Sequence, residues 1–568
     1  MFKRKLRLLR TIFVLVFIII VFRLYQVQVW QHSAMATMAQ KQFNSVVYQQ
    51  PRRGIIYDCN GQVLALTVEV NSCAVRPKQV KDPVKVSQQL AALLDLSYQQ
   101  VYAGVTSSRS FVWLKRKPEP GISRKIENID IPGIVVVKEN RRFYPEGGLA
   151  RAVIGVVGMD NQGLSGIECY FDKILRGLPV KYTRTRDALG RLIQEDEKES
   201  SEAGQPKNIV LTLDKVIQYI TERELKSACD KYKAKTGIAV VEDTKSGAIL
   251  ALAQYPSFDG NNWSGFSSRQ LENWAVHTIF EPGSTFKIVA AAAALETGLF
   301  KKDDKIFCEN GRYKVADKFI HDHEKQGWLT LAQVIEYSSN IGVAKLAEKL
   351  GKEKLYSSAR NFGFGNSTGI TLPGETSGIL RLPNKWSGTS LAMVSFGQEV
   401  GVNALQLIGA YACIANKGVL LEPAVIKEIF NLKGENKYSF SPAIIRQVIP
   451  AEVAGELSEM LAGVVERGTG KEARVEGYRV AGKTGTAQKF DPQTKKYSPD
   501  RYVASFCGFL PAEKPRIAIL IILDEPQTDY YWGGTVSAPV FSRIATQVMN
   551  YLNIPSLQKV SQLALKNK

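Results

Sequence analysis

The sequence predicts a multidomain α+β protein with an N-terminal membrane helix, a mixed accessory domain and a larger domain in which an antiparallel sheet is flanked by helices. Three observations lead to this prediction. The chain has 568 residues, too many for one ordinary domain. It opens with an apolar run behind a cluster of positive charges. Its second half alternates strand-like runs with helical stretches. We expect boundaries that give segments 1–35, 36–205 and 206–568.

Residues 1–35 read as a cytoplasmic tail and a membrane anchor. Basic residues precede an uninterrupted apolar run at residues 11–22, and the broader stretch 8–30 is long enough to cross a bilayer. Positive charge before the span places the N-terminus in the cytoplasm and the rest of the chain outside it. A cleaved signal peptide is the alternative, because Ala34-Met35-Ala36 has the small-x-small form. That site lies far beyond the apolar run, so we expect an uncleaved single-pass anchor in the cell membrane.

Residues 36–205 read as a mixed, irregular domain that contains many charges. Residues 134–137 are strand-like and residues 86–94 are helical. The polar residues 197–207 make a plausible link to the next domain. We therefore expect a mixed domain of short strands and helical patches.

Residues 206–568 predict an antiparallel sheet. Residues 238–242 and 248–253, separated by turn residues, read as a hairpin. Residues 503–510 and 517–523 read as two more strands, which would pair with the strand-like run 478–488. Helices lie between the two groups of strands. The sheet would therefore be assembled from both ends of the domain, around a central helix.

That central helix begins near Ser284. Pro282 and Gly283 break the chain just before this serine, and the apolar residues that follow leave no polar side, which is typical of a helix buried inside a domain. Lys287 lies three residues after Ser284, so both side chains project from the same side of the first turn. An amine so placed can take the proton of the hydroxyl, and helix N-terminal N–H groups favour an oxyanion. The alternative is that Ser284 only caps the helix.

Two further motifs follow in order. Ser338-Ser339-Asn340 comes after an amphipathic helical stretch, and Lys483-Thr484-Gly485-Thr486 lies in the strand-like run 478–488. Together with Ser284 and Lys287 they resemble the three-part signature of penicillin-binding proteins and serine β-lactamases. Residues 395–398 and 402–406 also resemble a segment of the former family, although Asn403 and Ala404 depart from its usual Thr-Pro. The resemblance implies the transpeptidase fold of that family.

The resemblance also implies a role for each residue. Ser284 would be acylated by the D-Ala-D-Ala end of a peptidoglycan stem pentapeptide, with Lys287 as the base, neutral because of its burial and the nearby charge of Lys483. Ser338 would relay a proton to the leaving amine, and Asn340 would hold the substrate amide. The remaining residues would bind substrate: Lys483 through the carboxylate, Thr484 and Thr486 through hydroxyls, and Gly485 by close backbone approach. The N–H groups of Ser284 and Thr486 would form the oxyanion hole.

Two segments of the accessory domain carry a second resemblance. Residues 53–61 look like the Arg-Gly-x-Ile-x-Asp-Arg-Asn-Gly segment of class B penicillin-binding proteins, with Cys59 in place of the arginine. Residues 163–168 look like another segment of the same elongated, dimerisation-like pedestal. Locally, both segments predict tight turns. The resemblance implies a division or sporulation enzyme that cross-links peptides, makes no glycan, and works beside a multi-span membrane glycosyltransferase.

Composition excludes several other kinds of protein. The net charge is +20, but no basic repeat or RNA-binding motif accompanies it, so an anionic membrane or cell wall fits better than nucleic acid. The seven cysteines form no Cys-x-x-Cys pair, which favours neither a disulfide framework nor a zinc site. His321-Asp322-His323 has no third ligand cluster nearby, so we interpret it as a solvated loop. We expect neither a metal nor another cofactor.

Two glycine clusters resemble phosphate loops only superficially. Residues 363–369 follow no apolar strand, and residues 468–471 lack the required spacing, so both predict turns.

Two other functional classes stay open. A serine β-lactamase shares the three motifs, although secreted ones are much shorter and lack a module like residues 40–204. A penicillin-binding sensor or a non-enzymatic scaffold of a wall-building complex is the second alternative, although such a protein ordinarily shows a damaged motif or an added signalling domain. The family resemblance also implies that β-lactam antibiotics bind at Ser284.

Overall fold

The computed structural model describes residues 2–186, 192–197, 204–262, 266–491, 493–494, 496–528 and 531–556. The chain packs into two compact units. One consists of residues 1–52 and 176–206, and the other of residues 53–175 and 207–568. The three predicted segments, with boundaries near residues 35 and 205, stay a prediction.

The first unit contains the predicted N-terminal helix. Residues Phe2–Trp30 are long and apolar enough to cross a membrane, with a mean hydropathy of 2.4, and none of this stretch is buried. The unit also holds a three-stranded antiparallel sheet in the order β1-β6-β7. Its elements are α1 (Phe2–Tyr25), η1 (Gln26–Trp30), α2 (His32–Phe43), β1 (Asn44–Gln49), β6 (Val180–Arg186) and β7 (Leu192–Glu197).

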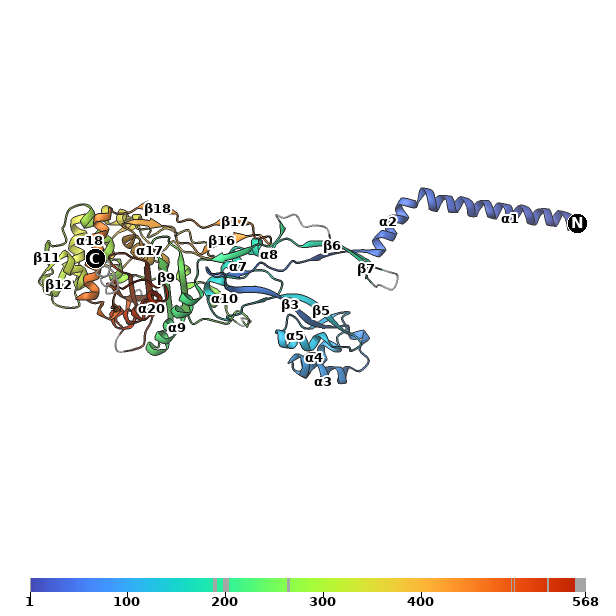
Figure 1. Cartoon of the computed structure of the whole chain (residues 1–568), viewed down its shortest axis with the longest axis horizontal. Helices are drawn as coiled ribbons and strands as arrows, with labels where there is room; N and C mark the ends of the chain where they lie inside the picture. The colour runs from blue at the N-terminus through green and yellow to red at the C-terminus, as the bar shows by residue number, and fades with distance from the viewer. Residues whose placement is uncertain are drawn as a thin grey trace, which may run out of the picture. The chain divides into compact units, whose positions relative to one another are not determined.

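In the second unit, a small lobe forms around two long paired strands (Figure 1). The strands β3 (Val63–Val75) and β5 (Ile134–Phe143) include the predicted strand at 134–137, and α3 (Pro83–Leu94) is the predicted helix. The core of the lobe is formed by Val75, Leu90, Val101 and Ile126, together with their neighbours. The remaining elements of the lobe are η2 (Pro77–Gln79), α4 (Tyr98–Val105), β4 (Val112–Lys115) and α5 (Pro120–Glu127).

A seven-stranded sheet joins this lobe to later parts of the chain. Its order is β17-β16-β8-β2-β3-β4, and β5 also pairs with β3. Thus β2 (Ile56–Tyr57) lies parallel to β8 (Asn208–Leu211), which pairs with β16 (Ile426–Phe430) and through it with β17 (Asn436–Ser439). Strands from residues 56 to 439 therefore share one hydrogen-bonded layer. Sequence periodicity cannot reveal this arrangement, because each of these strands is short.

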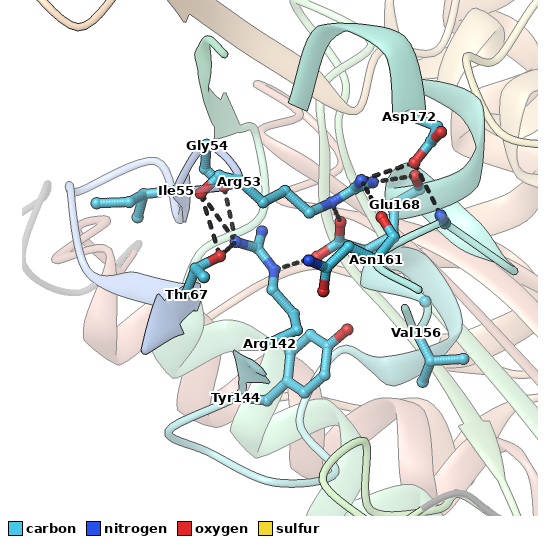
Figure 2. Close-up of polar contacts among 12 residues, drawn as sticks. Arg53, Gly54, Ile55, Thr67, Arg142, Tyr144, Val156, Asn161, Glu168 and Asp172 are labelled. Carbon is cyan, nitrogen blue, oxygen red and sulfur yellow. Dashed lines mark hydrogen bonds and ion pairs between the residues drawn. The ribbon is translucent and has the colours of Figure 1, made fainter. Parts of the chain in front are cut away.

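A buried ion cluster fixes the two accessory segments that carried the family resemblance (Figure 2). Glu168 is completely buried and accepts from Arg53 Nε at 2.5 Å and from Arg142 Nε at 2.6 Å. Arg53 also donates to Asp172 at 2.6 Å, and Arg142 donates to the carbonyl oxygen of Gly54 at 2.8 Å. One carboxylate thus holds two guanidinium groups from different segments together. Glu168 lies on α7 (Gly166–Tyr170), which follows α6 (Arg151–Ile154) and precedes α8 (Asp172–Arg176).

We expect Glu168→Gln to destabilise the protein by about 3–5 kcal/mol, because the change removes the buried counter-charge of Arg142 and leaves Arg53 with Asp172 alone. Chemical denaturation followed by circular dichroism would measure the loss. Glu459→Gln is the matched control, since Glu459 pairs with Arg479 but is 59% exposed and should cost less than about 1 kcal/mol. Equal effects of the two substitutions would contradict the structural role of the cluster.

The predicted antiparallel sheet is confirmed. It has five strands in the order β10-β9-β21-β20-β19, and all neighbours are antiparallel. The predicted hairpin is β9 (Thr236–Asp243) with β10 (Ile249–Tyr255), and the late strands are β20 (Lys496–Leu510) and β21 (Ile517–Asp524). The third motif lies on β19 (Ala481–Asp491), at the edge of the sheet.

Helices cover both faces of this sheet, as the apolar run at 517–523 requires. On β21, Ile519 and Ile521 pack with α9 (Lys215–Tyr232) and α20 (Ala538–Tyr551), whereas Leu520 and Ile522 face the other core. That second core contains α17 (Ala404–Ala415), which contacts β9, β20 and β21. Its N-cap is Asn403, whose side chain accepts from Gln406 N at 2.8 Å. Asn403, which departs from the family pattern, thus begins this helix.

Candidate active site

A cavity of about 600 Å³ lies beside β19 and is lined by residues of all three predicted motifs. Ser284, Ser338, Asn340, Thr484 and Thr486 lie on its surface. Lys287, Lys483 and Gly485 do not line it, and the two lysine side chains are fully buried. The structure therefore brings the three motifs together around one opening.

Ser284 lies in a short 3-10 turn, η4 (Gly283–Phe286), which continues directly into the helix α12 (Lys287–Glu296). The predicted helix start is confirmed, and residues 286–294 are fully buried, as their composition predicts. Two hydrogen bonds hold the turn: Thr285 Oγ1 donates to Pro282 O at 2.7 Å, and the Tyr411 hydroxyl donates to Thr285 O at 2.9 Å. The nucleophile candidate is thus presented by a rigid, buried support.

The Lys287 amine points from α12 toward the second motif. Its Nζ donates to Ser338 O at 2.6 Å and contacts Ser338 Oγ at 3.1 Å. Burial lowers the pKa of Lys287 to about 7, while the negative charge of Asp322 and the Cys308 thiol oppose that shift. A large fraction of this amine is therefore neutral near pH 7, as a general base requires.

The second motif forms the turn between α13 (Leu331–Glu336) and α14 (Asn340–Leu350). Ser338 has a φ of +61°, in the left-handed region that a serine rarely adopts. Asn340 Nδ2 donates to His321 O at 3.0 Å, which fixes the orientation of the amide. The turn thus directs the Ser338 hydroxyl toward Lys287 and the Asn340 side chain toward the cavity.

On β19, the Lys483 amine bends back toward the neighbouring Thr484, although strand alternation puts the two residues on opposite faces. Lys483 Nζ lies 3.3 Å from Thr484 Oγ1, and Thr484 Oγ1 lies 2.8 Å from Thr469 Oγ1. Burial, together with the charge of Lys287, lowers the pKa of Lys483 well below its usual value. Burial is the main cause of the lowered pKa of both lysines, and the repulsion between the two positive charges disfavours charging both amines at once.

Glycines allow the third motif and the segment 395–398 to pack closely against the Ser284 turn. A Cβ at Gly485 would lie 2.3 Å from Ser505 Oγ, 2.9 Å from Thr285 Cγ2 and 3.0 Å from Pro282 O. A Cβ at Gly397 would lie 2.2 Å from Gly283 O. Gly485 is therefore needed for contact with the Ser284 turn, in addition to the predicted approach of substrate.

A larger cavity of about 1140 Å³ lies next to this one, and the two share Ala487. Among the residues that line the larger cavity, none belongs to the predicted site. Its wall includes Glu281, whose pKa is raised to about 6 by burial, and the ion pair Arg381–Glu399. We assign the chemistry to the smaller cavity because only it contains a serine whose turn leads directly to a buried lysine.

Sequence reasoning missed several residues that line the site. Thr469 lies in the glycine-rich turn at 468–471, which is a turn as predicted but borders the cavity. The His323 ring packs against Trp532 with centroids 4.5 Å apart. Asp322, half-buried, accepts hydrogen bonds from the second motif. The two imidazoles are exposed, as expected of a solvated segment, but the loop prediction is wrong for His321, which ends β13 (Lys318–His321), and Asp322 is bound to the second motif. The sequence offers one indirect signal for the role of Asp322, which is that the first turn of α14 contains no acidic residue of its own.

The second unit contains further helices and strands. They are α10 (Ser268–Leu271), α11 (Trp274–His277), β11 (Lys305–Phe307), η5 (Glu309–Gly311), β12 (Arg312–Val315), β13 (Lys318–His321), β14 (Trp328–Thr330), α15 (Lys352–Asn361), η6 (Pro383–Lys385), α16 (Ser390–Ser395), β15 (Val419–Leu421), β18 (Ile444–Gln447), α18 (Ala451–Glu466), η7 (Lys471–Ala473) and α19 (Gly533–Val536). The glycine-rich residues 363–369 lie after α15 in turns and coil, as predicted.

Comparison with protein families gives two matches. Residues 237–546 match the penicillin binding protein transpeptidase domain, and residues 48–211 match the penicillin-binding protein dimerisation domain. The first match contains all three motifs. The second contains both accessory segments, held together by Glu168.

Curated proteins and solved structures resemble the chain over most of its length. Stage V sporulation protein D of Bacillus subtilis is 35% identical over 96% of this chain and 86% of its own. The peptidoglycan D,D-transpeptidase FtsI of Escherichia coli is 34% identical over 88% of this chain and 84% of its own. A crystal structure of penicillin binding protein 3 from Mycobacterium tuberculosis with aztreonam is 31% identical, with a TM-score of 0.69, and covers 90% of this chain and 98% of that one.

Proposed function

This chain belongs to the penicillin-binding proteins that join a dimerisation domain to a transpeptidase domain, and on that premise we propose that it is a peptidoglycan D,D-transpeptidase. It cross-links stem peptides through an acyl-enzyme on Ser284. The observation that carries the proposal is the buried Lys287 amine, which follows the Ser284 turn directly and contacts Ser338 Oγ at 3.1 Å. A serine, a base and a proton relay thus meet at one cavity.

In the first half of the reaction, Ser284 Oγ attacks the carbonyl carbon of the penultimate D-Ala while neutral Lys287 accepts the hydroxyl proton. The C–N bond to the terminal D-Ala then breaks, and the proton passes through Ser338 to the leaving amine. The Ser284 and Thr486 N–H groups stabilise the oxyanion, which contributes several kcal/mol in comparable enzymes. The product is a Ser284 ester and free D-Ala.

In the second half, the amine of a neighbouring stem peptide attacks the ester carbonyl. A new amide bond forms, the ester bond breaks, and the proton of the amine returns to Ser284 by way of Lys287. Substrate backbone lies along β19, whose position at the edge of the sheet supports the addition of an extended peptide. Asn340 holds the substrate amide. Because Asn340 Nδ2 donates to His321 O, its side-chain oxygen is the atom that accepts from the substrate.

The substrate carboxylate lies beside Thr484 and Thr486. Burial disfavours the protonated form of Lys483 in the free enzyme. A bound substrate carboxylate would favour that form, so binding of the substrate is coupled to protonation of Lys483. Thr486 Oγ1 accepts from Gly533 N at 3.0 Å and keeps its proton for the substrate. Selectivity for a peptide with a free C-terminus follows from this arrangement.

A fluorescent penicillin tests the reaction class. We expect one label per chain, formed covalently and released far more slowly than it forms, because a transpeptidase has no need to activate water on the acyl-enzyme. Rapid penicillin turnover would identify a β-lactamase instead. Absence of any covalent adduct would favour a non-enzymatic scaffold.

The setting of the enzyme is also a proposal. The anchor, residues 1–35, crosses the cytoplasmic membrane with its N-terminus inside, and the pedestal, residues 36–205, and the transpeptidase domain, residues 206–568, lie outside. The unburied Phe2–Trp30 helix and the basic residues before it support this topology. Protease protection in spheroplasts, read with a tag before Phe2, checks it. An N-terminal tag that is cleaved from outside would contradict it.

The proposed partner is a multi-span membrane glycosyltransferase, and the cellular role is division or sporulation. Arg23 and Gln26 on the outer half of the anchor add polarity to a surface that could contact such a protein. Purified protein given lipid-linked disaccharide pentapeptide is expected to make no glycan strands alone. Polymerisation by this chain would contradict the class B assignment.

A further inference from the structure

We propose that Asp322 is a positioning residue of this active site, whose carboxylate holds the turn that carries Ser338 and Asn340 in the geometry needed for acyl transfer. The inference deepens the proposed function and rests on it. It comes from a segment, His321-Asp322-His323, to which the sequence assigned no role.

The carboxylate accepts two hydrogen bonds from the second motif and one from the residue that follows it. Asp322 Oδ2 accepts from Ser339 Oγ at 2.6 Å, and Oδ1 accepts from the backbone N–H groups of Asn340 at 2.6 Å and Ile341 at 3.0 Å. Asp322 directly follows β13, 18 residues before Asn340, so these bonds join two separate elements. The neighbouring His321 O receives the Asn340 amide in the same place.

These contacts complete the N-terminus of the helix α14 from a separate element of the chain, because a single capping side chain leaves further N–H groups of the first turn without a partner. Ser339 already caps the helix, because its Oγ accepts from Gly342 N at 2.9 Å. Asp322 accepts from the hydroxyl of that cap and from the next two backbone N–H groups, those of Asn340 and Ile341. The turn that leads from α13 into α14 is also the one in which Ser338 adopts a φ of +61°. A conformation that serine disfavours must be held by its surroundings, and the Asp322 contacts supply that restraint.

The charge of Asp322 is not used in an ion pair. Within the described part of the chain, no Lys, Arg or His comes within 4.0 Å of its carboxylate. The positive groups that it meets are the N-terminal N–H groups of α14 and, across Ser338, the Lys287 amine, whose protonated form it favours. The Asp322 carboxylate thus binds the second motif directly and acts on the Lys287 base through its charge.

Other titratable groups near α12 are accounted for. Cys308 and Asp322 favour the charge on Lys287, and Lys483 is the other buried amine at the site. On the helices packed against α12, several charged side chains are held in ion pairs of their own: Lys345 with Glu309, Lys354 with Glu296, Glu336 with Arg467, and Glu459 and Glu466 with Arg479. Removing the charge of Asp322 therefore removes the carboxylate that acts most directly on Lys287.

The variant Asp322→Asn tests both effects in the full-length protein. Penicillin acylation rates measured from pH 5.5 to 9.5 give a plateau rate and the midpoint of the rise that follows deprotonation of Lys287. We expect the plateau to fall about 10- to 100-fold, the equivalent of one charge-assisted hydrogen bond. We also expect the midpoint to move to lower pH, because loss of the negative charge lowers the pKa of Lys287 further.

Asp322→Glu keeps the charge but displaces it, so the plateau should fall while the midpoint stays near that of the wild type. Asp214→Asn is the matched control: Asp214 caps α9 through Val216 N and Ile217 N, at 2.8 and 3.2 Å. It should lower the melting temperature and leave both the plateau and the midpoint unchanged.

Two outcomes would overturn the inference. One is an Asp322→Asn profile with the wild-type midpoint, and the other is an Asp322→Glu plateau equal to that of the wild type. If the wild type itself forms no acyl-enzyme, the proposed function fails. If the wild type is acylated and Asp322→Asn behaves like Asp214→Asn, only the role of Asp322 fails.

Discussion

Ser284→Ala is expected to abolish covalent labelling by penicillin and to leave the fold intact. Ser284 supplies the only predicted nucleophile of the cavity, so its hydroxyl cannot be replaced by a neighbouring group. The hydroxyl makes no cap contact in its turn, so the substitution should change stability by about 1 kcal/mol or less. Gel fluorescence and intact-protein mass spectrometry would measure the label, and circular dichroism the fold.

A matched serine separates this effect from loss of structure. Ser97 begins the helix α4 with a capping box, far from the three motifs in the sequence. Ser97→Ala should cost about 1 kcal/mol of stability and label at the wild-type rate. Labelling that persists in Ser284→Ala, on a different residue, would show that the nucleophile has been misassigned.

Lys287→Met is expected to lower the rate of acylation by about 10²- to 10⁴-fold, the usual contribution of a positioned general base. Methionine is unbranched and similar in length to the lysine stem, so it fills the same buried space while the amine that contacts Ser338 is removed. In the wild type the acylation rate should rise with pH around the Lys287 pKa of about 7, because the neutral amine is the active form. An ordinary lysine would give that rise near pH 10.5.

Lys354→Met is the control, since Lys354 forms an ion pair with Glu296 at the end of the same helix, α12, and lies partly exposed. Its acylation profile should match that of the wild type. A Lys287→Met variant that retains the wild-type rate, or a wild-type profile that is flat between pH 6 and 8, would refute the role of Lys287 as base.

The sequence predicts the catalytic sheet and the Ser284 helix well, for identifiable physical reasons. Residues 517–523 are apolar without alternation, which requires burial on both faces, and β21 is covered by α9 and α20 on one side and α17 on the other. The alanine-rich helix after Lys287 has no polar side and is fully buried. Patterns that reflect burial of a whole element can be interpreted without knowledge of its partners.

Contacts between distant segments cannot be predicted in this way. Nothing in the spacing of residues 56, 208 and 426 shows that β2, β8 and β16 share a sheet. The bend of Lys483 toward Thr484 depends on the length of a side chain rather than on strand alternation. Asp322 contacts Asn340 only because the β12–β13 hairpin returns to the start of α14. Each of these features is created by tertiary packing.

The most direct test of peptide cross-linking through Ser284 is mass spectrometry of the purified protein given a stem pentapeptide ending in D-Ala-D-Ala and an acceptor amine. The predicted result is a peptide containing Ser284 that carries the donor minus one D-Ala, together with a product in which the acceptor amine has replaced that D-Ala. Donor that is only hydrolysed, with the acceptor unchanged, or an adduct on any residue other than Ser284 would contradict it.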